Sequence, residues 1–161
     1  MSTSSLVELA RAYIEQEQSR RREQAEARVL PIRKRLTAEG EFRLVHPGVV
    51  WEACQTWLDE TRRFGRDVVA HVVQHPQALP LLEQPDDVEG FRRFIAEWLA
   101  RELEEYIMPN CLAFMKERGI HVEQEVRIVR HRAEMAIAQM TKELLAQIHL
   151  ATRRVPAASS R

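Results

Sequence analysis

Val122–Thr152 reads VEQEVRIVRHRAEMAIAQMTKELLAQIHLAT and contains neither glycine nor proline. Most of its residues have a high helix propensity. Its apolar residues recur at steps of three and four, at Val122, Val126, Val129, Ala133, Ala136, Met140, Leu144, Ile148 and Ala151. At about 100° per residue these positions fall on one narrow stripe. The segment is therefore predicted to be a long amphipathic helix that buries this stripe against other helices.

The composition outside this segment favours the same class. The chain has 161 residues, of which 45% are hydrophobic and 30% charged, which is typical of an ordinary soluble domain. It has only five glycines and two tyrosines, which favours an all-α fold. We expect residues 1–152 to form a single helical domain and residues 153–161 to form a flexible C-terminal tail.

Charge and cysteine usage exclude several functional classes. The 24 basic and 24 acidic residues balance, which argues against the dense positive surface that nucleic-acid binding needs. No apolar run approaches the ~20 residues of a membrane span, and the start MSTSSLVELA lacks the pattern of a signal peptide. Cys54 and Cys111 are too far apart in the sequence to indicate a disulfide framework. We expect a cytoplasmic protein that binds neither nucleic acid nor membrane.

The first predicted helix begins at a capping box, Ser5-Leu6-Val7-Glu8. Its middle, Gln16–Arg28, is polar on all sides, so we expect it either to be incompletely docked or to project toward solvent or a protein partner. The basic run Arg20-Arg21-Arg22 within it is interpreted as a solvated face. Pro31 is expected to kink or restart the helix, and Gly40 to end it.

Two further long helices are predicted between these segments. The run VVWEACQTWLDETRRFGRDVVAHVVQH, which Pro76 ends, has apolar residues at three–four spacing from Val50 to Val72. The next helix begins near Asp86, is expected to be kinked or interrupted by Pro109, and closes at Gly119. Short joints between four long helices indicate an antiparallel bundle of about four long helices. The alternative is a globin-like arrangement, divided by Pro31, Pro76 and Pro109 into shorter helices.

Glu102 is the most unusual residue of the predicted core. It lies within the apolar arc of its helix, where a charged residue is costly unless it is paired or protonated. In an antiparallel bundle it falls near the height of Thr61. Together with two indoles and a phenol, these groups would suit a mid-bundle ligand pocket formed by Glu102, Thr61, Trp57, Trp98 and Tyr106. The alternative is that Glu102 reaches an arginine or water at the edge of the core.

The remaining candidates are weaker. His71 and His75 stand one helical turn apart, which is half of a zinc site, and the alternative is that both lie at the surface near the end of their helix. The chain lacks the Glu-x-x-His spacing of ferritin-type bundles, a phosphate-binding glycine loop and a nucleophile elbow. We therefore expect a protein that is not an enzyme.

One stretch resembles a known family. FGRDVVAHVVQHPQALPLLEQPDDVEGFRRFIAEWL (Phe64–Leu99) is similar to the early helices of globin-type sensor domains, and the likeness extends to about residue 121. It implies a globin-like fold in which His121, in RGIHV, would bind haem iron. Gly65 stands where an aromatic residue is expected, and no loop separates His121 from the following helix. We therefore predict that the likeness is limited to topology and that no haem is bound.

These observations predict a non-catalytic cytoplasmic regulatory, sensor or protein-interaction domain, with a small-ligand pocket at mid-bundle as an added feature. Homo-oligomerisation is expected through Val122–Thr152, because Ile128, Met135 and Leu145 add apolar surface outside its main stripe. Gln16–Arg28 is a candidate segment for a protein partner. No cofactor is predicted. The alternatives are a haem- or divalent-metal-binding sensor, through His121 or through His71 and His75, and an enzyme of unknown class.

Overall fold

The computed structural model describes residues 5–38, 47–117, 119 and 123–154. Over these ranges the chain is almost entirely helical and has no strand, which confirms the predicted all-α class. Three of the elements are long helices: α1 (Leu6–Ala38), α2 (Pro47–Gln74) and α6 (Glu123–Arg153). The remaining elements are α3 (Ala78–Leu82), α4 (Pro85–Glu102), the π-helical turn η1 (Leu103–Ile107) and α5 (Met108–Glu117).

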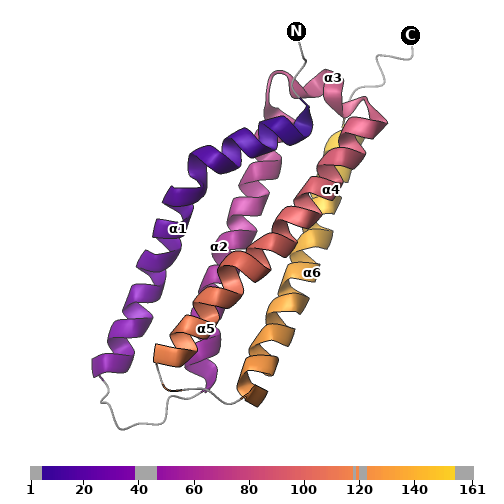
Figure 1. Ribbon diagram of the computed structural model, residues 1–161. Helices are drawn as coiled ribbons and strands as arrows, with labels where there is room; N and C mark the ends of the chain where they lie inside the picture. Colours follow the sequence, from indigo (N-terminus) through magenta and orange to yellow (C-terminus); the bar gives the residue numbers. More distant parts are fainter. Residues whose placement is uncertain (1–4, 39–46, 118, 120–122, 155–161) are drawn as a thin grey trace.

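The long elements form an antiparallel bundle (Figure 1), as predicted. α4, η1 and α5 together act as the third long helix, so the chain runs down, up, down and up along one axis. α1 packs against α2 and α4, whereas α6 packs against α2 and α4 from the other side. α1 and α6 therefore lie at opposite edges of the bundle (Figure 1).

α1 begins as its capping box predicts. The Ser5 Oγ accepts a hydrogen bond from the Glu8 backbone N–H at 3.1 Å, and a Glu8 carboxylate oxygen accepts one from the Ser5 N–H at 3.3 Å. The predicted break at Pro31 is wrong, because α1 continues through this residue to Ala38. The bend visible in α1 lies in its N-terminal half, upstream of Pro31 (Figure 1).

The third long helix accommodates Pro109 by a π-helical turn. Proline has no backbone N–H, and its ring clashes with the carbonyl four residues before it. In η1 the Met108 N–H bonds to the Leu103 carbonyl, five residues back, so the helix widens just before Pro109 and then continues as α5. After α5, Gly119 turns the chain with a φ of +70°, a conformation that favours glycine.

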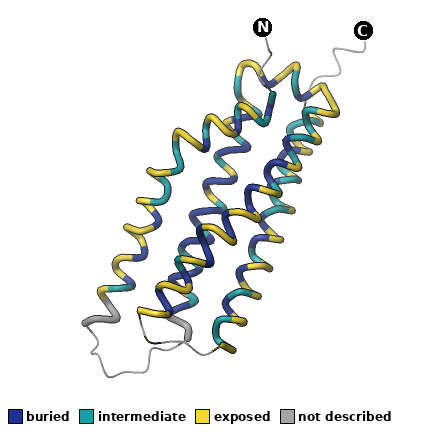
Figure 2. The backbone as a smooth tube through the Cα atoms, viewed as in Figure 1, coloured by how far each residue is buried: buried dark blue, intermediate teal, exposed yellow. Residues whose placement is uncertain are grey.

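A single hydrophobic core cluster joins all the helices, and its residues form a buried side along the bundle that is interrupted in the middle of α1, between Ile14 and Ala25 (Figure 2). In α6 the buried stripe is slightly rotated from the predicted one. Ile137 is buried, whereas Val126 and Ala136 are only half-buried. Gly65 allows α2 to approach α6 closely, because a Cβ at this position would lie 2.6 Å from the Leu144 Cδ1 atom.

Parts of several predictions fall outside the described residues. They include His121, Val122, the expected helix end at Gly40 and most of the expected tail at 153–161. Arg153 ends α6 and Arg154 follows it in a turn. Within the described part of the chain, no helix combines the length and the apolar character of a membrane span.

Candidate functional site

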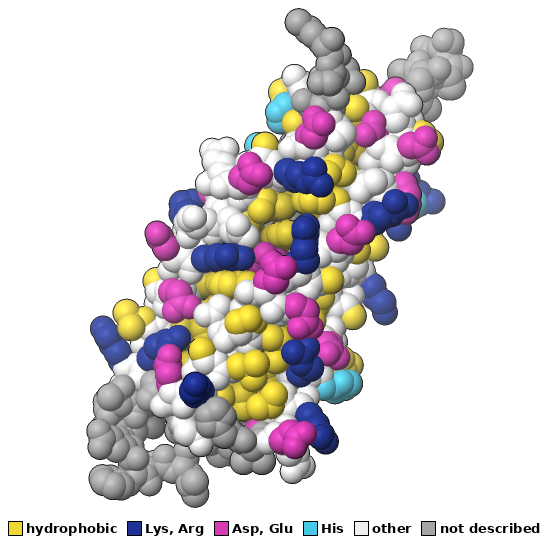
Figure 3. Space-filling model, viewed as in Figure 1, with side chains coloured by type: hydrophobic (Ala, Val, Ile, Leu, Met, Phe, Trp, Pro, Cys, Tyr) yellow, Lys and Arg dark blue, Asp and Glu magenta, His cyan; other side chains and the backbone are white. Residues whose placement is uncertain are grey.

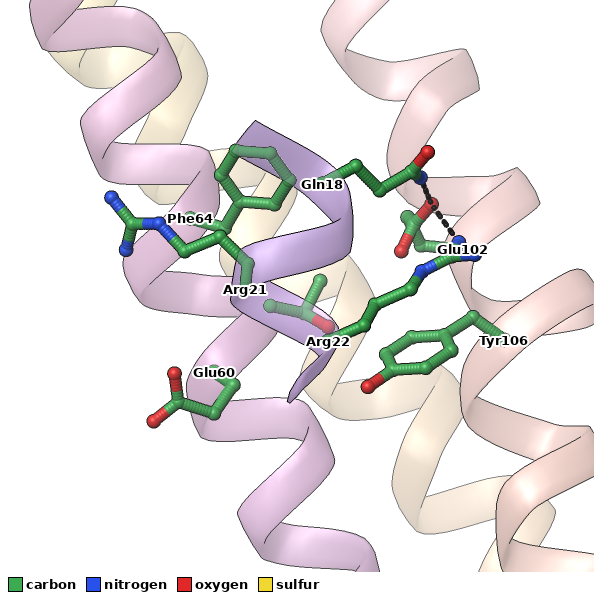
Figure 4. A pocket seen from close by; sticks show the side chains of 8 residues that line it. Gln18, Arg21, Arg22, Glu60, Phe64, Glu102 and Tyr106 are labelled. Atoms are coloured by element: carbon green, nitrogen blue, oxygen red, sulfur yellow. Dashed lines mark hydrogen bonds and ion pairs between the residues drawn. The ribbon is translucent and has the colours of Figure 1, made fainter. Parts of the chain in front are cut away.

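A small pocket with several charged residues around it lies at mid-bundle, between α1, α2 and the junction of α4 with η1 (Figure 4). Its cavity volume of about 10 Å³ is close to the minimum that a single water molecule needs. Eight residues line it: Gln18, Arg21, Arg22, Glu60, Thr61, Phe64, Glu102 and Tyr106. The structure thus brings together three of the five predicted pocket residues, Glu102, Thr61 and Tyr106.

Glu102 is buried and lies where α4 passes into η1, with 7% of its surface exposed. Its carboxylate Oε1 accepts a hydrogen bond from the Gln18 side-chain amide at 3.4 Å and one from the Arg22 Nη2 at 3.3 Å (Figure 4). Burial raises the pKa of Glu102, and it outweighs the neighbouring Arg22, which lowers this pKa. Glu102 is therefore a carboxylate at the edge of the core that reaches an arginine, as one of the two predicted alternatives describes.

Tyr106 lies below Arg22 (Figure 4). The Arg22 guanidinium carbon is 4.5 Å from the centre of the phenol ring, a cation–π contact. The buried hydroxyl has no hydrogen-bond partner among the described residues. Burial is the main cause that raises the Tyr106 pKa, followed by the nearby Glu26 carboxylate.

The other polar groups of α2 at the pocket are already engaged. The Thr61 Oγ1 donates to the Trp57 carbonyl at 2.9 Å, within its own helix. The buried Glu60 carboxylate forms an ion pair with Arg28 of α1 at 2.5 Å. The two arginines and two glutamates that line the pocket balance in charge, although the Nε atoms of Arg21 and Arg22 and the Oε1 atom of Glu60 have no hydrogen-bond partner among the described residues.

The two predicted indoles do not line the pocket. The Trp57 Nε1 donates to the Glu26 carboxylate at 3.2 Å, and its ring packs edge-on against Phe114. Trp98 packs edge-on against Phe64, with 5.4 Å between ring centroids. Its buried Nε1 has no partner within the described ranges. Both indoles pack in the core and do not line the cavity.

α1 contributes the residues that the sequence analysis missed. Arg21 forms an ion pair with Asp67 of α2 and lies over the Phe64 ring at 5.3 Å, while Arg22 and Gln18 hold Glu102. The interpretation of Arg20-Arg21-Arg22 as a wholly solvated face is therefore wrong, because Arg21 and Arg22 are half-buried. The spacing of Gln18, Arg21 and Arg22 could have indicated that they face inward. These positions continue the three–four pattern of buried residues from Ile14 to Ala25.

The polar middle of α1 is docked on its inner side. Its inward residues form the ion pairs described above, and Ala25 is fully buried. The outer residues of Gln16–Arg28 are exposed, including Arg20 and Glu23. Figure 3 shows a band of apolar side chains along the bundle, which acidic and basic side chains interrupt at several places. Polar contacts therefore contribute substantially to holding α1 in place.

The histidine pair has other contacts in the structure. The His71 ring stacks on Tyr13 at 4.3 Å between centroids, and the His75 Nδ1 accepts a hydrogen bond from the Gln77 N–H at 3.1 Å. In the ranges that the structure describes, no group of three or more His, Cys, Asp or Glu side chains is placed to hold a metal ion. A closed zinc site needs three or four such ligands.

Cys54 and Cys111 are distant in sequence but meet in the core between α2 and α5. Both are free thiols with no exposed surface. A hydrogen bond with Cys54 and burial raise the pKa of Cys111. Such thiols are unreactive, because the thiolate is the nucleophilic form.

A second candidate site is the outer face of α6. It exposes three large apolar side chains, Ile128, Met135 and Leu150, by 41%, 61% and 53%. At about 100° per residue they lie within about 60° of one another, roughly opposite the buried stripe. Leu145, the third residue predicted to extend the apolar surface, is half-buried against the core. The described elements leave about half or more of the surface of Met135 and Leu150 uncovered.

No known protein family, curated protein or solved structure matches this chain.

Proposed function

We propose that this protein is a non-catalytic, regulatory helical interaction domain that self-associates through the outer face of α6. The observation that carries this proposal is the exposure of Ile128, Met135 and Leu150 on one side of a single long helix. These residues are spread over about 33 Å along one side of the helix, an arrangement that suits a contact with another long helix. The two buried reduced thiols fit the reducing cytoplasm, where we place the protein.

The mid-bundle pocket indirectly supports an interaction domain over a ligand-binding one. Its carboxylates are ion-paired within the chain, and its volume suits one water molecule rather than an organic ligand. A larger ligand would require α1 to move outward. The ligand-binding role is therefore a secondary part of the proposal, and the pocket residues are assigned mainly to holding α1.

The haem- or metal-binding alternative has less support. Its haem ligand, His121, lies outside the described residues, and the globin-type likeness stays a prediction. His71 and His75 have protein partners on Tyr13 and Gln77. A visible absorption spectrum and a metal analysis of the purified protein test this alternative directly.

Light scattering coupled to gel filtration tests self-association. We expect the apparent mass of the wild type to rise from the monomer value toward twice that value between low and high micromolar concentration. Met135→Glu places a charge in the centre of the face and should keep the protein monomeric.

The matched control is Leu79→Glu. Leu79 is 54% exposed, similar to Met135, but lies on α3 at one end of the bundle. The Leu79→Glu substitution should leave the dependence of apparent mass on protein concentration unchanged. A wild type that stays monomeric at high micromolar concentration, or equal behaviour of the two variants, would contradict the proposal.

A further inference from the structure

We propose that the occupant of the α6 face is a second copy of this chain, packed antiparallel, with the two-fold axis passing near Gln139. This inference rests on the proposed self-association and adds its orientation and register. It draws on the placement of apolar and charged residues along the exposed side of α6.

Two of the three apolar residues of this face, Ile128 and Leu150, are symmetric about Gln139, whereas Met135 lies four residues before it. Ile128 and Leu150 lie eleven residues before and after it. In an antiparallel two-fold pair centred at Gln139, each Ile128 would therefore face a Leu150 of the second copy. C2 interfaces are self-complementary in this way, since residue i meets residue j twice. The same register places the two exposed Gln139 side chains opposite each other.

One pair of opposite charges follows the same symmetry. Glu125 and Arg153 lie fourteen residues before and after Gln139. Neither has an ion-pair partner within the described part of its own chain. In the antiparallel register each Glu125 faces Arg153 of the second copy. Exposed pairs contribute little affinity, but they select orientation because the wrong arrangement juxtaposes like charges.

The parallel alternative is disfavoured by Lys142, an exposed cation of this face. A parallel pair would set Lys142 against Lys142. In the antiparallel pair the two Lys142 side chains are offset by about 9 Å along the axis, at 1.5 Å per residue, where salt screens their repulsion.

Cysteine cross-linking determines the orientation. We expect Gln139→Cys to form a disulfide-linked dimer under mild oxidation with diamide, because the two positions meet at the axis. Met135→Cys should cross-link poorly, since its two copies are offset by about 12 Å along the helices, beyond disulfide reach. The wild type is the control for Cys54 and Cys111, which are buried. Equal cross-linking of both variants, or none in either, would overturn the proposed orientation.

Charge exchange provides an independent test of the register. Glu125→Arg and Arg153→Glu should each weaken dimerisation several-fold in sedimentation equilibrium, and the double variant should recover most of the loss. A double variant weaker than either single variant would overturn the register. These results are distinguishable from failure of the proposed function, in which the wild type itself is monomeric at every concentration. Binding of that monomer to anionic vesicles would assign the face to a membrane surface and overturn both proposals.

Discussion

At the residue scale, Glu102 combines burial with a single guanidinium partner. Its raised pKa means that the folded state binds the proton more tightly than the unfolded chain does. The stability that this group contributes is therefore fully present below its ordinary pKa. It is lost as pH rises through the raised pKa of the folded state.

Glu102→Gln keeps the shape of the side chain and removes the charge. We expect the variant to remain within about 1 kcal/mol of the wild type near pH 4, and its stability relative to the wild type to increase by pH 8. Urea unfolding across this pH range measures the difference. Glu105→Gln, on the exposed side of η1, is the control and should show no such trend. A Glu102→Gln variant that is more destabilised at pH 8 than near pH 4 would mean that the Arg22 ion pair outweighs desolvation, and a loss equal at both pH values would mean that the two effects cancel.

The cysteine pair gives a second residue-scale prediction. Cys54 and Cys111 have no exposed surface, and the Cys111 pKa is raised. We expect neither thiol to react with a disulfide reagent in the folded protein at pH 8, and both to react in denaturant. Fast reaction of either thiol in the native protein would show that α5 separates readily from α2.

At the scale of the element, α1 differs from the other long helices in its attachment. Its ends are fixed by buried apolar residues such as Leu6 and Ile32, whereas its middle relies on ion pairs with Glu102, Asp67 and Glu60. Removing one partner of a buried pair leaves an uncompensated charge in the core. The strength of α1 docking therefore depends on a few arginines.

Arg22→Met tests this dependence. It retains much of the aliphatic stem but removes the guanidinium from both Glu102 and the Tyr106 ring, so we expect a loss of about 1–3 kcal/mol in the free energy of unfolding at pH 8. Arg20→Met is the matched control. Arg20 is exposed and, among the residues that the structure describes, pairs only with Glu17 on the same helix, so its loss should cost less than about 0.5 kcal/mol. Equal effects of the two substitutions would remove the special role of Arg22.

The helices themselves were largely predictable, because apolar spacing and the capping box are local signals. Glu102, Thr61 and Tyr106 could be brought together from helix periodicity and antiparallel order alone. The role of α1 could not be predicted in this way, because Gln18, Arg21 and Arg22 carry no apolar signal and their acidic partners are remote in sequence. The indoles of Trp57 and Trp98 were misplaced because a small rotation of each helix decides whether a ring faces a cavity or the core.

At the scale of the whole molecule, two helix faces depart from the usual rule that apolar residues lie inside and polar residues outside. These two faces lie at opposite edges of the bundle. α1 turns a polar face inward, and α6 leaves apolar residues outward. The first arrangement weakens the cohesion of the isolated bundle, whereas the second would recover stability on association. Stability and oligomerisation are therefore expected to be linked.

This linkage predicts a thermal midpoint that depends on protein concentration. A partner that binds only the folded chain stabilises it by RT ln(1 + [L]/Kd), about 1.4 kcal/mol at a tenfold excess over Kd. For a chain of 161 residues this corresponds to an increase of about 3–5 °C. Calorimetry from low to high micromolar wild type should show this rise, and Met135→Glu should show a constant midpoint. A constant wild-type midpoint would mean that the exposed face of α6 contributes nothing to the stability of the molecule through self-association.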